Sequence, residues 1–180
     1  MEPSDPQPLD TVFPAAGDAE LPPDFKPEFL TFLLDGVPFA IPVDSVREVV
    51  GCLPITDVPG ASPVLRGVMN VRGAVVPVLD LRVALGLPPA PITRRSCVVI
   101  HELLDAGREV PVGALVDVVQ AVLGADHEDA SSAGPGRASN IGAVRKEFVV
   151  RELMLGGRPT ILLNTERLLA LDELKERLLQ

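Results

Sequence analysis

Aromatic residues are nearly absent from this chain of 180 residues, which has no Trp, no Tyr and only 3% aromatics in all. Proteins that bind sugars or single-stranded nucleic acids commonly stack these ligands on aromatic rings, so both functions are disfavoured. Hydrophobic residues nevertheless make up 47% of the chain. The core must therefore be aliphatic, and its β-branched bias predicts a mainly β protein.

Residues that carry catalysis or bind metals are also few. Cys52 and Cys97 lie far apart without CxxC spacing, and His101 and His127 have no third ligand at helical or hairpin spacing. We therefore expect reduced thiols and no metal site. The sequence has no Gly-rich loop followed by Lys-Ser/Thr, the pattern that binds phosphate. It also has no candidate general base close in sequence to a candidate nucleophile. We expect no cofactor and no enzymatic activity, with a small hydrolase as a remote alternative.

Positive charge is outnumbered, with 16 Lys and Arg against 25 Asp and Glu and a net charge of −9. An acidic surface repels phosphate backbones and anionic membranes, so neither nucleic acid nor a membrane is an expected partner. No apolar run reaches transmembrane length, and the N-terminus lacks the basic and apolar regions of a signal peptide. We expect a cytoplasmic protein.

Residues 1–28 are a Pro-rich acidic tail whose composition is typical of disordered segments. We expect folded structure to begin after this tail. Phe29–Leu34 and Val37–Ile41 flank Asp35-Gly36 and predict a hairpin. Pro38 and Pro42 would confine the second strand to a sheet edge or interrupt it.

The segment Val43–Gly51 has two interpretations that spacing leaves open. Ser45 and Glu48 match the spacing of a helical capping box. The same residues could instead form a strand that places Val46 and Glu48 on one face and Arg47 and Val49 on the other.

The central stretch, Val64–Leu81, predicts a second hairpin. Its two apolar runs flank Arg72-Gly73, and Pro77 makes the second strand an edge strand or a bulged one. Asp80 is a candidate N-cap for a short helix, Leu81–Leu85. Arg72 is unusual here because tight hairpin turns favour Asn, Asp or Gly. The simplest interpretation is an exposed, solvated turn residue.

The chain then repeats itself. Val43–Gly51 matches Val116–Gly124 at an offset of 73, and the second hairpin with its helix recurs at an offset of 84, with Gly73 on Gly157 and Asp80 on Asn164. The difference is absorbed by a Ser/Gly-rich loop, 125–142. Two strand-rich halves, about 29–90 and 96–171, predict two packed barrels rather than a solenoid.

The last element is expected to be a helix. Asn164 or Thr165 would cap it, and Leu168, Leu171, Leu174 and Leu178 recur at helical spacing. Such a stripe usually faces a core, so the helix would cover the open end of a barrel. The distal turns, including 173–180, could instead bind a partner.

The segments 41–50 (I-P-V-D-S-V-R-E-V-V) and 58–82 (V-P-G-A-S-P-V-L-R-G-V-M-N-V-R-G-A-V-V-P-V-L-D-L-R) resemble the CheW family of chemotaxis coupling proteins. The resemblance covers about 29–172. It implies two SH3-like five-stranded β-barrels side by side, with short helices and a C-terminal helix. It also implies a non-enzymatic adaptor that joins the cytoplasmic tip of methyl-accepting receptors to the regulatory domain of the histidine kinase CheA. The receptor hairpin would lie in an apolar groove between the barrels, and the kinase domain would dock barrel to barrel.

Carried over by motif, the partner-binding residues would be Val46, Glu48, Gly67 and Arg72. Each has a structural alternative: a core valine, a helix-capping glutamate, a bulge glycine, and a turn or ion-pair arginine. The repeat places Ala121 opposite Glu48 and Gly156 opposite Arg72, so the fold itself does not demand charges there. Arg is, moreover, favoured at protein interfaces.

The chain also departs from the family pattern. Val149–Leu155 is polar where an apolar strand with a small residue is usual, and Asn164 stands where Asp is common. These departures leave open an adaptor of a parallel kinase pathway, such as surface motility.

Overall fold

The computed structural model describes residues 26–51, 54–105, 107–125 and 144–169. Most of the predicted tail, most of the Ser/Gly-rich loop and the residues predicted to form the distal part of the C-terminal helix lie outside these residues. The described part is mainly β, as the composition predicts, and its ten strands form two five-stranded sheets.

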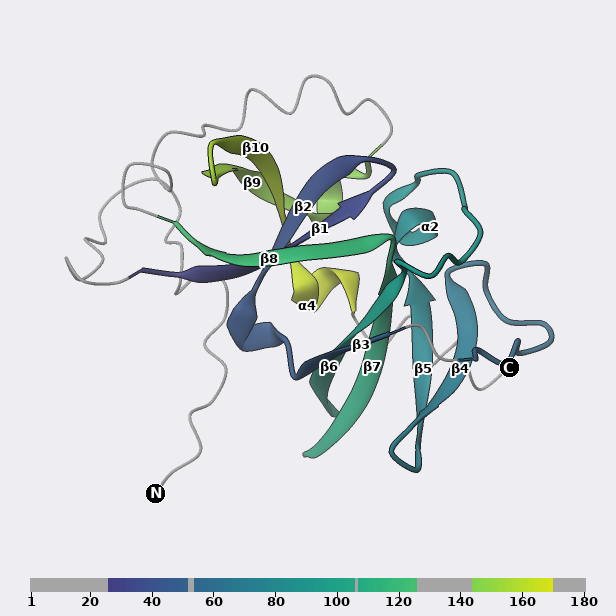
Figure 1. Cartoon of the computed structure of the whole chain (residues 1–180). Helices are drawn as coiled ribbons and strands as arrows, with labels where there is room; N and C mark the ends of the chain where they lie inside the picture. Colours follow the sequence, from purple (N-terminus) through teal and green to yellow (C-terminus); the bar gives the residue numbers. More distant parts are fainter. Residues whose placement is uncertain (1–25, 52–53, 106, 126–143, 170–180) are drawn as a thin grey trace.

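Sheet 1 has the strand order β8 (Val118–Gly124), β1 (Glu28–Leu34), β2 (Val37–Pro42), β10 (Arg158–Leu163), β9 (Val149–Leu155). Sheet 2 has the order β3 (Glu48–Gly51), β6 (Cys97–Asp105), β7 (Arg108–Val116), β5 (Ala74–Asp80), β4 (Leu65–Val71). Four short helices accompany them: η1 (Val43–Ser45), α2 (Leu81–Leu85), η3 (Lys146–Phe148) and α4 (Thr165–Leu168). Figure 1 shows the sheets side by side, with β8 running on from the end of β7.

The two sheets do not divide the chain as the sequence repeat does. Strands β1 and β2 of the first half share sheet 1 with β8, β9 and β10, whereas β6 and β7 of the second half share sheet 2 with β3, β4 and β5. The repeat is still visible in the topology, because equivalent strands of the two halves occupy the same positions in the two sheets. Each half therefore supplies part of both sheets, and the chain crosses from one sheet to the other after β2 and again after β7.

Pro38 was expected to mark an edge strand or an interrupted one, and Pro77 an edge strand or a bulged one, but β2 and β5 are both interior. Each strand pairs in parallel on one side, β2 with β10 from Phe39 onward and β5 with β7 from Val78 onward. Each proline thus lies one residue before the parallel ladder begins, where its missing N–H leaves no gap in the ladder. The edge-strand prediction is wrong, and this offset is the physical reason.

The turn and cap predictions are confirmed. Asp35-Gly36 joins β1 to β2, and both residues have positive φ, as a two-residue hairpin turn requires. The Asp80 carboxylate accepts from the Val83 N–H at 3.3 Å and caps α2. At the equivalent position of the repeat, the Asn164 side chain caps α4 by accepting from the Arg167 N–H at 3.0 Å.

The main core lies between the two sheets. It combines Leu30, Phe32, Phe39 and Ile161 of sheet 1 with Val99, Ala114 and Val116 of sheet 2, and with residues of α2 and α4. Phe32 and Phe39 are fully buried and stack with their ring centroids 6.2 Å apart. Burial of this apolar surface is the main force that holds the sheets together.

Candidate functional site

Two of the four predicted site residues, Glu48 and Arg72, form an ion pair. Glu48 opens β3 and Arg72 lies at the tip of the β4–β5 hairpin, and Arg72 Nη2 is 2.9 Å from Glu48 Oε2. The Arg72 side chain is 78% exposed, whereas that of Glu48 is only 19% exposed. A half-buried carboxylate therefore holds an exposed guanidinium at the surface of sheet 2.

The backbone of Arg72 adopts a conformation that is unfavourable for most residues other than glycine. Its φ is 51°, in the left-handed region, and the following Gly73 has φ 89°. The turn is held by the Asn70 side chain, which accepts from the Gly73 N–H at 2.9 Å. A non-glycine residue in this region costs about 1 kcal/mol or more. The guanidinium is thus present at a position where the turn alone would favour glycine or asparagine.

Sheet 1 contains the same turn without the charges. Gly156 takes the place of Arg72, and it faces Leu123 of β8, whose Cδ1 lies 3.3 Å from the position of a Cβ on that glycine. Ala121 takes the place of Glu48. The tip of the β9–β10 hairpin therefore lies beside an apolar side chain of β8. The tip of the β4–β5 hairpin instead forms an ion pair with β3. The geometry of the fold does not require the pair.

The segment that carries Val46 and Glu48 is a short 3-10 turn followed by a strand, not a capped α-helix. The Ser45 hydroxyl donates to the Pro42 carbonyl at 2.7 Å, and Glu48 belongs to β3. The capping-box interpretation is therefore wrong and the strand alternative holds for residues 48–51. Val46 is half-buried and packs against the main core.

Gly67 is fixed by the fold. It is buried, has φ 147°, and sits where the register between β4 and β5 shifts. A Cβ at this position would lie 2.3 Å from the Thr56 carbonyl oxygen. The backbone that approaches Gly67 is thus the chain's own, at the isolated bridge between Thr56 and Val68. Gly67 shapes the strand that carries Arg72, and the bulge-glycine alternative describes it.

His101 is a buried residue that positions this site, a role that was not predicted from the sequence. Its Nδ1 lies 2.6 Å from the Ser45 carbonyl oxygen, so the neutral ring donates to η1 from β6. Burial lowers the pKa of His101 to about 4, against a smaller opposing effect of the bond to Ser45. On the outer side of the same strands, Arg47 and Glu102 form an exposed ion pair. The segment before Glu48 is therefore attached to β6 on both sides.

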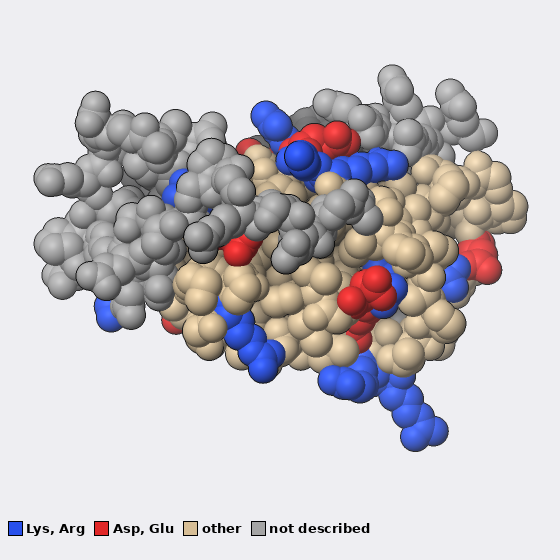
Figure 2. Space-filling model, turned by 90° about the horizontal axis from the view of Figure 1, so that it is seen from above, with Lys and Arg blue, Asp and Glu red and all other residues tan. Residues whose placement is uncertain are grey.

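The surface around the ion pair carries exposed apolar side chains. Val75, on β5 just beyond the turn, is 68% exposed. Val49, which follows Glu48 in β3 and lies on the opposite face of that strand, is 39% exposed. Figure 2 shows another face of the molecule, seen from above, where blue and red side chains are scattered over a largely tan surface. Apolar area beside a few charged groups is typical of a protein interface.

The interior of the contact between the sheets is filled by the chain's own side chains. The expected apolar groove, which would lie at the surface between the two barrels, stays a prediction. A hollow of about 500 Å³ is open beside the contact between the sheets, between residues 60–64, Val83 of α2 and Arg145. The Arg145 N–H donates to the Leu85 carbonyl at 2.9 Å, which holds this segment against α2.

Within the described residues, no group of three or more His, Cys, Asp or Glu could hold a metal ion. Cys97 is a free thiol whose Sγ contacts the Arg95 carbonyl. Across that same part of the chain, no helix is long and apolar enough to cross a membrane.

Comparison with known proteins agrees with this architecture. The chemotaxis protein CheW of Bacillus subtilis is 32% identical over 125 residues, which span 69% of this chain and 78% of that protein. CheW of Klebsiella aerogenes is 31% identical over 147 residues, or 82% and 84% of the two chains. A probable CheW of Rhizobium etli is 36% identical, but the match spans 53% of this chain and 59% of the relative.

A solved structure shares the fold. The scaffolding protein TtCheW from Thermoanaerobacter tengcongensis superimposes with a TM-score of 0.64 at 23% identity, covering 77% of this chain and 89% of that one. The two sheets thus correspond to two SH3-like subdomains. The family profile described as CheW-like domain matches residues 28–173. The chain belongs to the CheW family and is a CheW-type scaffold or adaptor of chemotaxis signalling.

Proposed function

We propose that this protein is a cytoplasmic adaptor that binds the tip of a methyl-accepting receptor and the regulatory domain of the histidine kinase CheA. It acts by binding alone, so that the state of the receptor alters kinase output. Family membership supports the adaptor role. The choice of both partners rests on the motif resemblance around Glu48 and Arg72.

The Glu48–Arg72 ion pair is the observation that carries the proposal. In sheet 1, Gly156 and Ala121 stand at the equivalent positions, and Gly156 lies beside Leu123, so the same turn is built there without charge. An exposed ion pair contributes at most about 1 kcal/mol to folding, and Arg72 also adopts an unfavourable φ. A residue that the fold does not need and that strains its turn is best explained by a partner.

The geometry indicates how the pair would bind. Glu48 orients the guanidinium of Arg72 and leaves most of it exposed. A planar guanidinium can hold a carboxylate of the partner through two parallel hydrogen bonds. Val75, which follows the turn on β5, offers apolar contact nearby. Val46 and Gly67, which the motif also selects, act by holding the backbone of β3 and β4 in place.

The test is a variant of sheet 2 that copies sheet 1, Glu48→Ala with Arg72→Gly. Capture by immobilised receptor and CheA fragments, separately and together, and receptor-dependent kinase activity are measured with the purified variant. We expect loss of at least one binding reaction and of kinase activation. The matched control is Asp57→Asn, which removes a different exposed ion pair, between Asp57 and Arg66 of β4, and should leave both readouts unchanged. Full activity of the double variant would refute the assigned role of the pair.

A second candidate is an adaptor of a parallel kinase pathway. The protein PilI of Pseudomonas aeruginosa is 35% identical over 88 residues, which span 49% of this chain. The same capture assay separates the candidates when kinase fragments from each pathway of the host are compared. Binding to a kinase of another pathway and not to CheA would favour this alternative.

A further inference from the structure

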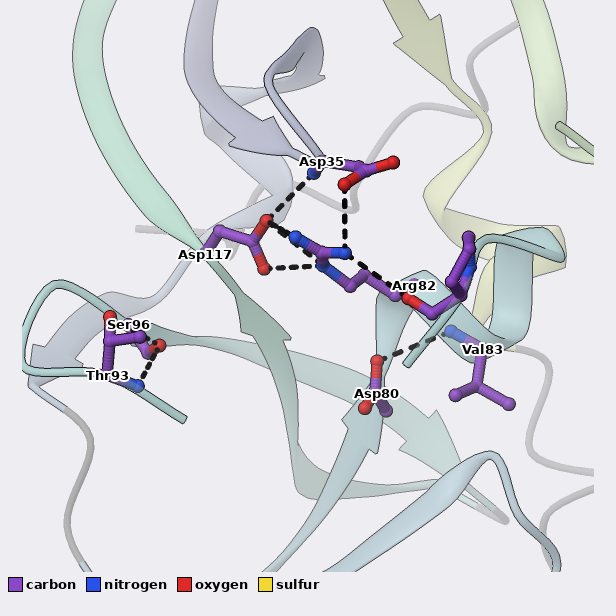
Figure 3. A network of polar contacts seen from close by, with 8 residues as sticks. Asp35, Asp80, Arg82, Val83, Thr93, Ser96 and Asp117 are labelled. Atoms are coloured by element: carbon purple, nitrogen blue, oxygen red, sulfur yellow. Dashed lines mark hydrogen bonds and ion pairs between the residues drawn. The ribbon is translucent and has the colours of Figure 1, made fainter. Parts of the chain in front are cut away.

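Arg82 connects three segments of the chain (Figure 3). It lies on α2 with a side chain that is 14% exposed. Its Nε donates to both carboxylate oxygens of Asp117 at 2.9 and 3.0 Å, and its Nη1 donates to Asp35 and to the Pro88 carbonyl, each at 3.2 Å. The bonds to Asp117 raise the pKa of Arg82. The guanidinium is therefore permanently charged and held by several partners at once.

Asp117 is the point at which the chain passes from sheet 2 to sheet 1. It is the single residue between the end of β7 and the start of β8. Its N–H donates to the Leu33 carbonyl at 3.2 Å, and its carboxylate accepts from the Asp35 N–H at 2.8 Å. Asp117 thus connects the crossing to the β1–β2 turn of sheet 1 and, through Arg82, to α2.

The other crossing, after β2, has different chemistry. In the repeat, Asp44 is equivalent to Asp117 and Glu166 to Arg82, and both are exposed. Two carboxylates cannot form the pair that Arg82 and Asp117 form. At that crossing the chain is attached to β6 by the His101 bond to Ser45 and by the exposed Arg47–Glu102 ion pair. The arginine network therefore belongs to one crossing only, and the repeated fold does not by itself require it.

We infer that Arg82, Asp117 and Asp35 form a joint that fixes the angle between the two sheets. The core between the sheets supplies most of the attraction, but apolar contact is not directional and tolerates small rotations. A planar guanidinium bound through several donors is directional. The joint holds the surfaces of the two sheets in one relative position, so that partners bound to each are held in register.

The joint is tested by the distance between the sheets in the free protein, which needs no partner. Spin labels are placed at Met154 on β9 and Arg66 on β4, both exposed, in a chain whose Cys52 and Cys97 are replaced by Ser. Double electron–electron resonance then gives the distance distribution. For Asp117→Asn and Arg82→Lys we expect about 10% or more of the molecules at distances that the parent protein does not show. Asp44→Asn, at the exposed equivalent of Asp117 in the other crossing, is the matched control and should keep the parent distribution.

Arg82→Lys keeps the charge and loses the planar fork, so it remains informative if Asp117→Asn does not fold. Circular dichroism confirms that each variant retains its strands. If the folded variants keep the parent distribution, the joint is refuted. Failure of the proposed adaptor function would appear instead as absent partner binding in the parent protein, whatever the distances.

Discussion

Replacement of Gly67 by Ala tests whether this glycine serves the fold or a partner. The added Cβ would lie 2.3 Å from the Thr56 oxygen and 2.7 Å from the Ile55 side chain. Thr56 and Val68 exchange two backbone hydrogen bonds at this point, of 2.8 and 2.9 Å. The neighbouring segment therefore cannot withdraw from the methyl group without breaking them.

The magnitude follows from two contributions. A non-glycine residue held at φ 147° stores about 1–3 kcal/mol of backbone strain. Loss of two backbone hydrogen bonds adds about 1 kcal/mol each. We expect the free energy of unfolding to fall by about 3–5 kcal/mol, a large part of the ~5–15 kcal/mol that a domain possesses.

Urea unfolding followed by far-ultraviolet circular dichroism measures this loss. The control is Gly36→Ala, because Gly36 also has positive φ, 76°, but its Cβ would meet no atom within 4 Å. The control should lose only about 1 kcal/mol. If the two variants were equally stable, the steric argument would be refuted and Gly67 would again be a candidate for direct partner contact.

Four further outcomes are expected. Arg72→Gly should leave the free energy of unfolding within about 1 kcal/mol of the parent or raise it, since relief of the positive φ offsets loss of an exposed ion pair; a larger loss in urea unfolding would make Arg72 structural. Burial lowers the pKa of His101 from 6.5 to about 4, so between these values the unfolded chain binds a proton that the folded chain does not. Stability should therefore fall by up to about 3 kcal/mol as the pH drops from 6.5 to 4, and His101→Gln should remove that part of the fall in urea midpoints measured across this range. Asp80→Ala should cost about 1 kcal/mol through loss of the α2 cap, while Asp80→Asn should retain most of it in thermal melts. Because each half of the chain supplies strands to both sheets, calorimetry should show one cooperative transition, and two separate transitions would contradict this coupling.

The features predicted correctly from sequence are those decided within a few residues. Asp35-Gly36 and Arg72-Gly73 turn the chain because their backbone conformations are local choices. Asp80 and Asn164 cap helices because the acceptor and the N–H lie three residues apart. Such signals need no knowledge of the rest of the fold.

The exchange of strands between the halves is a non-local choice that the repeat does not reveal. Equivalent strands in two copies have equivalent patterns, so β3 could pair with β1 of its own half or with β6 of the other. The sequence offsets are the same in both cases. Pro77 was misjudged for a related reason, since its effect depends on where the ladder with β7 begins.

The site was only partly accessible from the sequence. The family motif selected Glu48 and Arg72, but their ion pair follows from the closure of sheet 2. His101, Arg82 and Asp117 were missed as determinants of the architecture. The available signal was a single charged or titratable residue within a strongly apolar run, as in V-I-H-E-L and L-V-D-V-V. Its partner could not be named, because each of these bonds joins distant segments of the chain.

The two sheets act as controls for each other, since they share strand order, turns and helix caps. Residues that the fold requires should recur in both, as the capping side chains of Asp80 and Asn164 do. Two ion pairs do not recur, Glu48 with Arg72 and Arg82 with Asp117. The equivalent turn of sheet 1 and the equivalent crossing after β2 form without such pairs. Stability of the fold alone gives no reason for such asymmetry. The proposed adaptor gives a reason, because it would present different surfaces to two different partners at a fixed angle.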